Sequence, residues 1–401
     1  MMNKIILTIG LVFGLTAGAR AENWAQFRGL DGSSVSSEKL PTKLAKSSIA
    51  WEIELPGRGL SSPIIFGDKV FISSASGPDQ SRLHVICLNA DSGKKLWERQ
   101  FWATGRTMTH PKTCVAAPTP VCDGERVYVL FSSNDLLCLD MEGNLVWLRG
   151  LTLDYPNASN SLGMTSSPIV IGDTLIVQIE NDSESFAAGV NVYSGENRWK
   201  LDRPKMANWT SPTVAKSDGK SVAILQSGKG IHAVNPRTGE EVWYFGGGAS
   251  TIPSSTFAGD GILYVPANGI TALKPGSATK DVKELWVSGQ LKPGTSSPVV
   301  VGKNIFTVNS AGVLTCGEIT EGKRLWQIRM KGKKFSATPV YAGGYLYAVN
   351  EEGLVQVIDI QGEEGEVISS LDLDEVVLGS PSVARGSLFI RSDRHVWKIG
   401  G

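Results

Sequence analysis

A short acidic segment is the first place in this 401-residue chain where the residue types could do chemistry. Glu180, Asn181 and Asp182 offer carboxylate and amide oxygens, which are the ligands that Ca²⁺ prefers. Their spacing does not follow an EF-hand loop, so a solvated acidic loop is the simpler interpretation. These three residues are the candidate metal ligands, and whether they bind a metal stays unknown from the sequence.

Two further segments carry polar and aromatic side chains that could contact a ligand. Arg106 and His110 lie in one of them, and histidine can serve as a general base or a metal ligand. A single loop histidine usually does neither. Trp102 and Trp209 could stack on a sugar or a quinone ring, although aromatic residues at the rim of a fold often serve only to pack.

The remaining cysteines and histidines have simpler interpretations. No Cys-x-x-Cys or Cys/His spacing typical of zinc is present, and no Ser/His/Asp arrangement or nucleophile elbow. Cys114 and Cys122 flank a predicted strand and could form a disulfide. We interpret the others as structural residues of strands, the cysteines as small core residues: Cys87, Cys138, Cys316, His84, His232 and His395. We therefore expect no catalytic residue.

A repeat of 40 to 52 residues must position these segments. A Trp closes each copy, and in five copies a Gly stands four residues before it, which suits a turn with a positive φ. The next position in the series holds Val367 instead of Trp, which we interpret as a copy of the repeat that has lost its tryptophan. The repeat residues are Trp51, Trp97, Trp147, Trp199, Trp243, Trp286, Trp326, Gly93, Gly143, Gly195, Gly239 and Gly322.

Each repeat predicts four short antiparallel strands, A to D. A Ser-Pro or similar pair, such as Ser62-Pro63, Ala117-Pro118 or Ile252-Pro253, precedes strand A, where proline needs no ladder N–H. Four strands per repeat predict the blade of a β-propeller, and the count predicts eight blades. The last copy lacks strand D, which residues 49–55 could supply to close the ring. An open solenoid of sheets is the alternative.

The ends and the charge of the chain suggest its compartment. Residues 1–21 resemble a secretory signal, with Lys4, an apolar run and a small-residue site ending at Ala21. Residues 22–48 form a polar lead-in before the propeller of residues 49–401. Without the signal, 37 basic residues face 39 acidic residues, so we expect no nucleic-acid partner. The apolar run is short for a membrane span, and no Cys comes directly after it, so we expect neither a span nor a lipid anchor in the mature chain. We expect a monomer in the periplasm or outside the cell.

Long predicted loops gather on one face. The D–A links at 101–116, 151–165 and 202–209 and the B–C links at 74–82 and 180–187 lie on the same side of blades 1 to 4. Loops carry function more often than scaffold strands do. This side is therefore the candidate binding face, with Arg106, His110, Glu180, Asp182 and Trp209.

The turn sequences resemble a known family. Residues 90–97 and 235–243 are similar to the Asp-x-x-Thr-Gly-x-x-x-Trp repeat of the PQQ-like β-propellers, over roughly residues 49–401. The lead-in, with Trp24, Phe27, Arg28 and Gly29, resembles the start of secreted PQQ-like proteins of the planctomycete type. The resemblance implies either a BamB-like scaffold or a quinoprotein dehydrogenase that binds pyrroloquinoline quinone (PQQ) and Ca²⁺.

We favour a secreted or periplasmic, non-catalytic binding or scaffolding module for a protein or glycan, with no cofactor. The vicinal Cys-Cys pair and the long insertions common in the dehydrogenases are not in this sequence. The alternative is a PQQ- or metal-dependent oxidoreductase that uses the loop-rich face of blades 1 to 4. Convergence of the acidic segment on a ring-sized cavity with a stacking Trp would favour the enzyme. A third possibility is capture of an extended peptide at a strand-D edge, with the Val367 repeat as the place to look.

Overall fold

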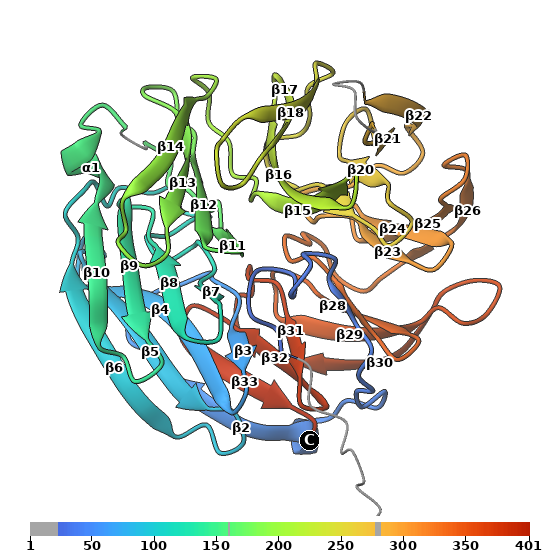
Figure 1. Cartoon of the computed structure of the whole chain (residues 1–401). Coiled ribbons are helices and arrows are strands. Elements are labelled where there is room, and N and C mark those ends of the chain that lie inside the picture. Colours follow the sequence, from blue (N-terminus) through green and yellow to red (C-terminus); the bar gives the residue numbers. More distant parts are fainter. Residues whose placement is uncertain (1–22, 159–160, 277–281) are drawn as a thin grey trace, which may run out of the picture.

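The computed structural model describes residues 23–158, 161–276 and 282–401. It is a ring of eight antiparallel sheets that stand like blades around a central axis (Figure 1). The predicted eight-bladed all-β propeller is confirmed. The predicted signal at residues 1–21 lies outside the described residues. No helix within the described part of the chain is long and apolar enough to cross a membrane.

Each blade runs from strand A at the axis to strand D at the rim. Blades 1 to 3 are β3 (Ile64–Phe66), β4 (Lys69–Ser76), β5 (Arg82–Asn89) and β6 (Lys95–Trp102); β7 (Val121–Cys122), β8 (Arg126–Leu130), β9 (Asp135–Asp140) and β10 (Leu145–Gly150); and β11 (Ile169–Ile171), β12 (Thr174–Ile179), β13 (Phe186–Asn191) and β14 (Asn197–Asp202). A single helical turn, α1 (Leu151–Asp154), follows β10.

Blades 4 to 8 continue the ring. They are β15 (Thr213–Ser217), β16 (Lys220–Ser227), β17 (Gly230–Val234) and β18 (Glu241–Phe245); β19 (Thr256–Phe257), β20 (Leu263–Val265), β21 (Ile270–Lys274) and β22 (Lys283–Ser288); β23 (Val299–Val301), β24 (Asn304–Val308), β25 (Val313–Glu318) and β26 (Arg324–Arg329); β27 (Val340–Ala342), β28 (Tyr345–Val349), β29 (Leu354–Asp359) and β30 (Glu366–Asp372); and β31 (Ser382–Ala384), β32 (Ser387–Arg391), β33 (His395–Ile399) and β2 (Ile49–Glu54).

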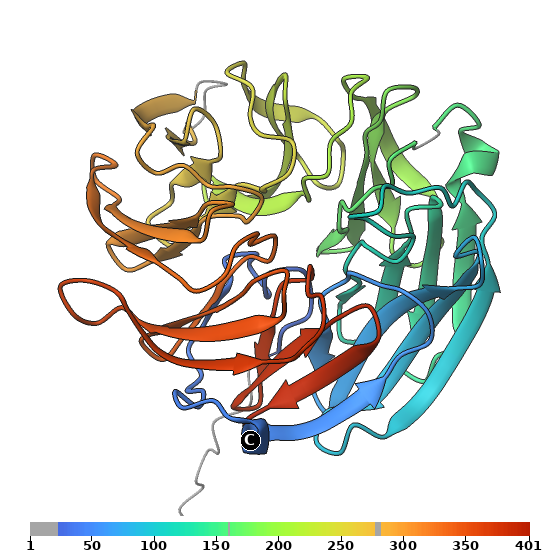
Figure 2. The same cartoon turned by 180° about the vertical axis from the view of Figure 1, so that it is seen from behind.

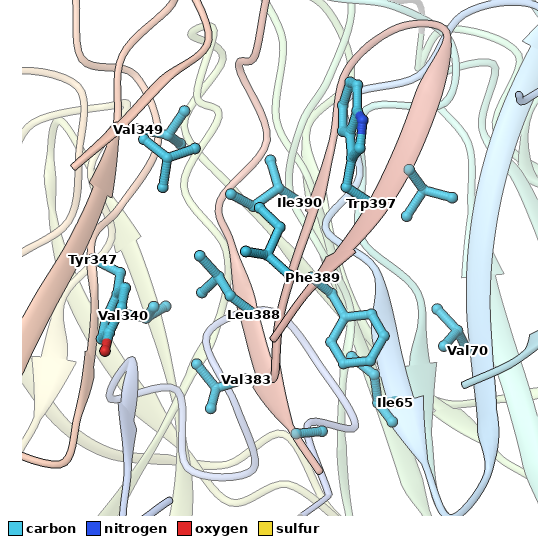
Figure 3. Packing of buried hydrophobic residues seen from close by; sticks show 14 of the residues in the cluster. Ile65, Val70, Val340, Tyr347, Val349, Val383, Leu388, Phe389, Ile390 and Trp397 are labelled. Atoms are coloured by element: carbon cyan, nitrogen blue, oxygen red, sulfur yellow. The ribbon is translucent and has the colours of Figure 1, made fainter. Parts of the chain in front are cut away.

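Strand β2 completes blade 8 and closes the ring. It pairs antiparallel with β33, with Ile49 opposite Ile399 and Glu54 opposite His395. The first strand of the propeller therefore stands beside the last, as predicted, and the open solenoid is excluded. Around this closure, side chains of blades 7, 8 and 1 form one core cluster, in which Phe389 and Ile390 are fully buried (Figure 3).

A tryptophan resting on a glycine joins neighbouring blades. Trp97 of blade 1 packs on Gly143 in the C–D turn of blade 2, and its indole N–H donates to the Met141 carbonyl at 3.0 Å. Gly143 has a φ of +82°, and a Cβ there would lie 2.7 Å from the Trp97 ring. The turn thus needs glycine for its backbone angle and for the indole of the previous blade. Five further joints share this contact: Trp51 with Gly93, Trp147 with Gly195, Trp199 with Gly239, Trp286 with Gly322 and Trp326 with Gly365.

The cysteines of the repeat lie opposite these indoles. Cys87 pairs across the ladder with Trp97, and Cys138 and Cys316 occupy the same position in blades 2 and 6. All five cysteines are buried free thiols, so the possible Cys114–Cys122 disulfide is not formed. Burial raises the pKa of each thiol to about 12. A neutral thiol is a poor nucleophile, which agrees with a packing role.

Blade 7 lacks the tryptophan, and the structure corrects the residue that replaces it. Ser369 lies opposite Val357 one step before a bulge, as Trp97 lies opposite Cys87. The register therefore assigns the Trp position to Ser369 rather than to Val367. The lead-in occupies this joint, because the backbone N–H of Leu44 donates to Ser369 Oγ at 2.8 Å.

The lead-in crosses the face that carries the A–B turns (dark blue in Figures 1 and 2). Its backbone pairs at Trp24 with Ile65 of blade 1. Farther on, β1 (Val35–Ser36) adds a fifth, innermost and parallel strand to blade 7 beside β27. The Glu38 carboxylate then accepts the N–H groups of the A–B turn of blade 8. These contacts fix the segment across the axis, where it can close the channel.

Candidate functional site

A cavity of about 510 Å³ lies on the axis and opens on the face of the D–A and B–C loops. Residues from all eight blades line it, and Phe27 of the lead-in forms part of its wall from the opposite side. The neighbouring Arg28 is buried and donates to Thr256 Oγ1 at 2.8 Å and to the Ser255 carbonyl at 2.7 Å. The lead-in therefore makes the cavity a blind pocket, within the size range of small-molecule sites.

A belt of eight hydroxyls surrounds the pocket, one from the residue before or near the start of each strand A. In seven links the backbone N–H of one belt residue donates to the hydroxyl of the next blade, at 2.9–3.0 Å. The belt residues are Ser62, Thr119, Ser167, Ser211, Ser254, Ser297, Thr338 and Ser380. These links tie the inner strands of adjacent blades to one another.

Two belt residues were not predicted from the sequence. Thr119 and Ser254 occupy the belt positions of blades 2 and 5, two residues beyond the predicted Ala117 and Ile252. Thr119 is followed by Pro120 and then by β7, so the Thr119-Pro120 pair, rather than Ala117-Pro118, is the one that precedes strand A of blade 2. Blade 5 has no proline after Ser254, which left no such signal.

Above the belt, the wall is mainly apolar. Trp209, Ile252, Phe335 and Leu378 line it, and the Trp209 indole N–H donates to the Gly163 carbonyl at 2.8 Å. This hydrogen bond fixes the ring at the pocket wall. The wall can therefore bury an apolar or aromatic group.

The mouth carries the charged groups. Lys112 Nζ, from the link between blades 1 and 2, forms an ion pair with Glu351 of blade 7 at 3.0 Å. Glu351 also accepts a hydrogen bond from Ser336 Oγ at 2.7 Å. Lys334 and His110 line the pocket as well. Glu351 is the one carboxylate among the described lining residues, and it is already paired.

The structure brings only part of the predicted binding face together. His110 and Trp209 line the pocket, whereas Arg106 and Asp182 are exposed and are not part of its lining. Glu180 is buried away from it, where Arg203 Nε donates to Oε1 at 2.6 Å and Asn208 Nδ2 to Oε2 at 2.9 Å. The carboxylates therefore do not converge on the cavity.

Asn181 and the strand histidines serve local structure. The side chain of Asn181 accepts the N–H of Ser183 at 2.7 Å and closes its own turn. His84, His232 and His395 each contact one carboxylate through Nδ1, at 2.7–2.9 Å. Within residues 23–158, 161–276 and 282–401, no group of three or more His, Cys, Asp and Glu side chains could hold a metal ion.

The comparisons agree with the fold. The family model described as outer membrane protein assembly factor BamB, a PQQ-type repeat, matches residues 42–178, 84–316, 266–368 and 310–400. The chain belongs to this PQQ-like propeller family. The recognition of the repeat in the sequence is thereby confirmed.

Relatives of this chain carry names with different functions. BamB of Moranella endobia is 23% identical over 56% of this chain, and tetrathionate hydrolase of Acidithiobacillus ferrooxidans is 23% identical over 88%. The chain spans 54% and 64% of the length of these relatives, less than two thirds of either.

Solved structures show the same fold at low identity. BamB from Moraxella catarrhalis is 15% identical with a TM-score of 0.61, covering 88% of this chain and 97% of that one. Quinohemoprotein alcohol dehydrogenase from Comamonas testosteroni is 12% identical with a TM-score of 0.69, covering 96% and 82%. At these identities the likeness concerns the propeller alone.

The quinoprotein members imply PQQ and a metal ion, and this pocket does not fit that pair. A hard divalent ion such as Ca²⁺ needs six to eight oxygen ligands, several of them carboxylates. The described pocket residues offer Glu351, which Lys112 and Ser336 already bind. Trp209 could stack on a flat ring, but no donor set for the metal stands beside it.

Proposed function

We propose that this PQQ-like propeller is a non-catalytic binding or scaffolding module in the periplasm or outside the cell, after removal of residues 1–21. The observation that carries the proposal is the blind axial pocket on the loop-rich face, with its apolar wall. The relatives named as BamB, which are assembly factors of the outer membrane, support both the role and the compartment. The partner is a protein or a glycan that docks on this face.

The chemistry of the pocket supports binding over catalysis. Its carboxylate is neutralised by an ion pair at 3.0 Å, and its single histidine is an exposed residue with no carboxylate partner among the described contacts. The buried thiols have raised pKa values and lie outside the pocket lining. The one hydroxyl–carboxylate pair among the described lining residues is Ser336 with Glu351, and the Lys112 ion pair makes that carboxylate a weak base for covalent catalysis.

Site-specific photocrosslinking tests the docking face. A photoreactive residue at Met108, which is exposed in the link between blades 1 and 2 that also carries His110, should crosslink a partner in the native cell envelope. The matched control is Lys303, an exposed residue in the A–B turn of blade 6 on the opposite face. Equal crosslinking from both positions, or a partner at Lys303 alone, would contradict the proposed face.

The oxidoreductase alternative rests on Trp209, a stacking residue in a ring-sized cavity. Thermal unfolding with and without PQQ and Ca²⁺ together distinguishes it. A ligand at about a hundred times its Kd, bound only by the folded protein, adds about 2.7 kcal/mol. We expect no rise in the midpoint, and a rise that Trp209→Ala abolishes would favour the enzyme.

A further inference from the structure

The hydroxyl belt presents a ring of hydrogen-bond donors to the pocket. A hydroxyl has one O–H donor and two acceptor lone pairs. Seven belt oxygens already accept a backbone N–H, and six of these show no hydrogen bond donated to another described residue. Those six are Thr119, Ser211, Ser254, Ser297, Thr338 and Ser380. Their hydrogens are therefore available to a ligand that carries acceptors.

The eighth member of the belt is the clearest pointer to a ligand. Ser62 is 1% exposed, lines the pocket and has no hydrogen-bond partner for its Oγ among the described residues. The hydroxyl next to it in the ring, Ser380, receives the N–H of Thr338 but passes no comparable link on to Ser62. A buried hydroxyl without a partner is unfavourable unless another group binds it. Ser62 lines the pocket, so a group bound in the pocket is the candidate partner for this hydroxyl.

The charge around the pocket selects the kind of acceptor. Arg28, next to Phe27 at the closed end, is fully buried, donates to Thr256 and to the Ser255 carbonyl, and has Asp31 as its nearby carboxylate. At the mouth, Lys334 adds a positive charge, while Glu351 and Lys112 neutralise each other. The cations at the two ends of the pocket, Arg28 and Lys334, favour an anionic acceptor over a cationic ligand.

The shape completes the description of the ligand. Phe27 of the lead-in lines the end of the pocket opposite the loops, so the lead-in stands in the way of a chain that would pass along the axis. Above the belt, Trp209, Phe335 and Leu378 form an apolar wall. A ligand that enters end-on would meet the donors with its head and the wall with its body.

We propose that the axial pocket binds a carboxylate carried on an apolar body, with the carboxylate at the hydroxyl belt. The source is either a free organic acid or the C-terminus of a protein chain, which share this chemistry. The inference deepens the proposed function, because it assigns a ligand chemistry to the same face. A carboxylate accepts up to four hydrogen bonds, and bonds to a charged group are stronger than bonds between neutral groups.

Isothermal titration of the mature protein tests the proposal with stated probes. Decanoate and 3-phenylpropionate represent free acids, and a hexapeptide ending in Phe represents a chain terminus. Their methyl esters, and the same peptide as a C-terminal amide, keep the apolar body and lose the charge. We expect at least one acid to bind, and its ester or amide to bind at least tenfold more weakly. No binding by any acid at millimolar concentration, or equal binding of acid and ester, overturns the proposal.

A pair of serine variants locates the head group. Ser62→Ala removes a donor that holds no structural hydrogen bond, so the fold should persist while acid binding weakens about tenfold. Ser166→Ala is the matched control, because Ser166 Oγ is also buried without a partner but lies outside the pocket lining. Equal affinity of Ser62→Ala and wild type refutes a carboxylate at the belt.

The two sources and the two proposals separate in these measurements. Tighter binding of the peptide acid than of the free acids indicates a chain terminus, and the reverse indicates a small molecule. Acid binding without a crosslinked partner at Met108 would keep the ligand site and refute the docking face. A crosslinked partner without acid binding would do the opposite.

Discussion

Replacing Gly239 by alanine should test the joint between blades 3 and 4. Gly239 has a φ of +74°, and an added Cβ would lie 2.7 Å from Cδ2 of Trp199. The left-handed backbone alone makes alanine unfavourable by about 1–2 kcal/mol, offset in part by the lower entropy of the unfolded alanine chain. Pushing the indole from a packed joint adds about 1–3 kcal/mol. The total destabilisation should therefore be about 2–4 kcal/mol.

Gly219 in the same blade is the matched control. Its φ is +72°, and an added Cβ would meet nothing within 4 Å. Gly219→Ala should thus show the backbone effect alone, about 1 kcal/mol. The assay is urea unfolding followed by tryptophan fluorescence, with the midpoints of both variants compared at equal slope. Equal destabilisation by the two alanines would refute the account of the joint, and Trp199→Leu should partly rescue Gly239→Ala by removing the ring.

Three further changes probe packing and charge. Burial alone would raise the pKa of Glu98, but hydrogen bonds from Lys95, His84 and Gln100 lower it to about 2. The ionised carboxylate therefore stabilises the protein above its unfolded pKa, and this stability is lost as pH falls from about 5 to 2. The drop in the free energy of unfolding between pH 6 and pH 3, measured by urea unfolding, should be smaller in Glu98→Gln by at most about 2 kcal/mol. The five thiols should resist a thiol reagent in the native protein and react after unfolding, because each is buried with a raised pKa; fast native labelling would contradict this. Leu44→Ala should destabilise by about 2–5 kcal/mol in urea unfolding, since Leu44 is 8% exposed in the core cluster, whereas Leu30→Ala in the same lead-in, 59% exposed, should change little.

The fold was predictable because its signals are local and repeated. A Gly turn, a Trp four residues later and a Ser-Pro pair before strand A each report on one blade, so a single irregular copy does not change the count. The sequence could not show that six of the tryptophans rest on a glycine of the next blade, because that contact crosses the joint. The position of Ser369 was missed for a related reason: the bulge and the longer turn of blade 7 shift the strand by two residues.

The site was predicted less well, because its residues act through contacts that are distant in sequence. His110 and Trp209 were identified as loop residues, and they line the pocket. Glu180 was predicted as a candidate metal ligand, whereas the structure shows it in an ion pair with Arg203, 23 residues away. The belt was not predicted, because a single serine before a proline indicates only the start of a strand. The closed ring is what brings the eight hydroxyls side by side.

The lead-in connects the regular ring with its irregular site. At blade 7 the chain lacks the indole that joins the other blades, and residues of the lead-in lie there instead, with Leu44 bonded to Ser369. The same segment passes the axis, where Phe27 and Arg28 close the channel. One stretch of chain therefore completes the joint of blade 7, which has no tryptophan, and shapes the pocket. A change that loosens the lead-in should then act on stability and on ligand binding together, whereas a change in a Trp joint remote from it should act on stability alone.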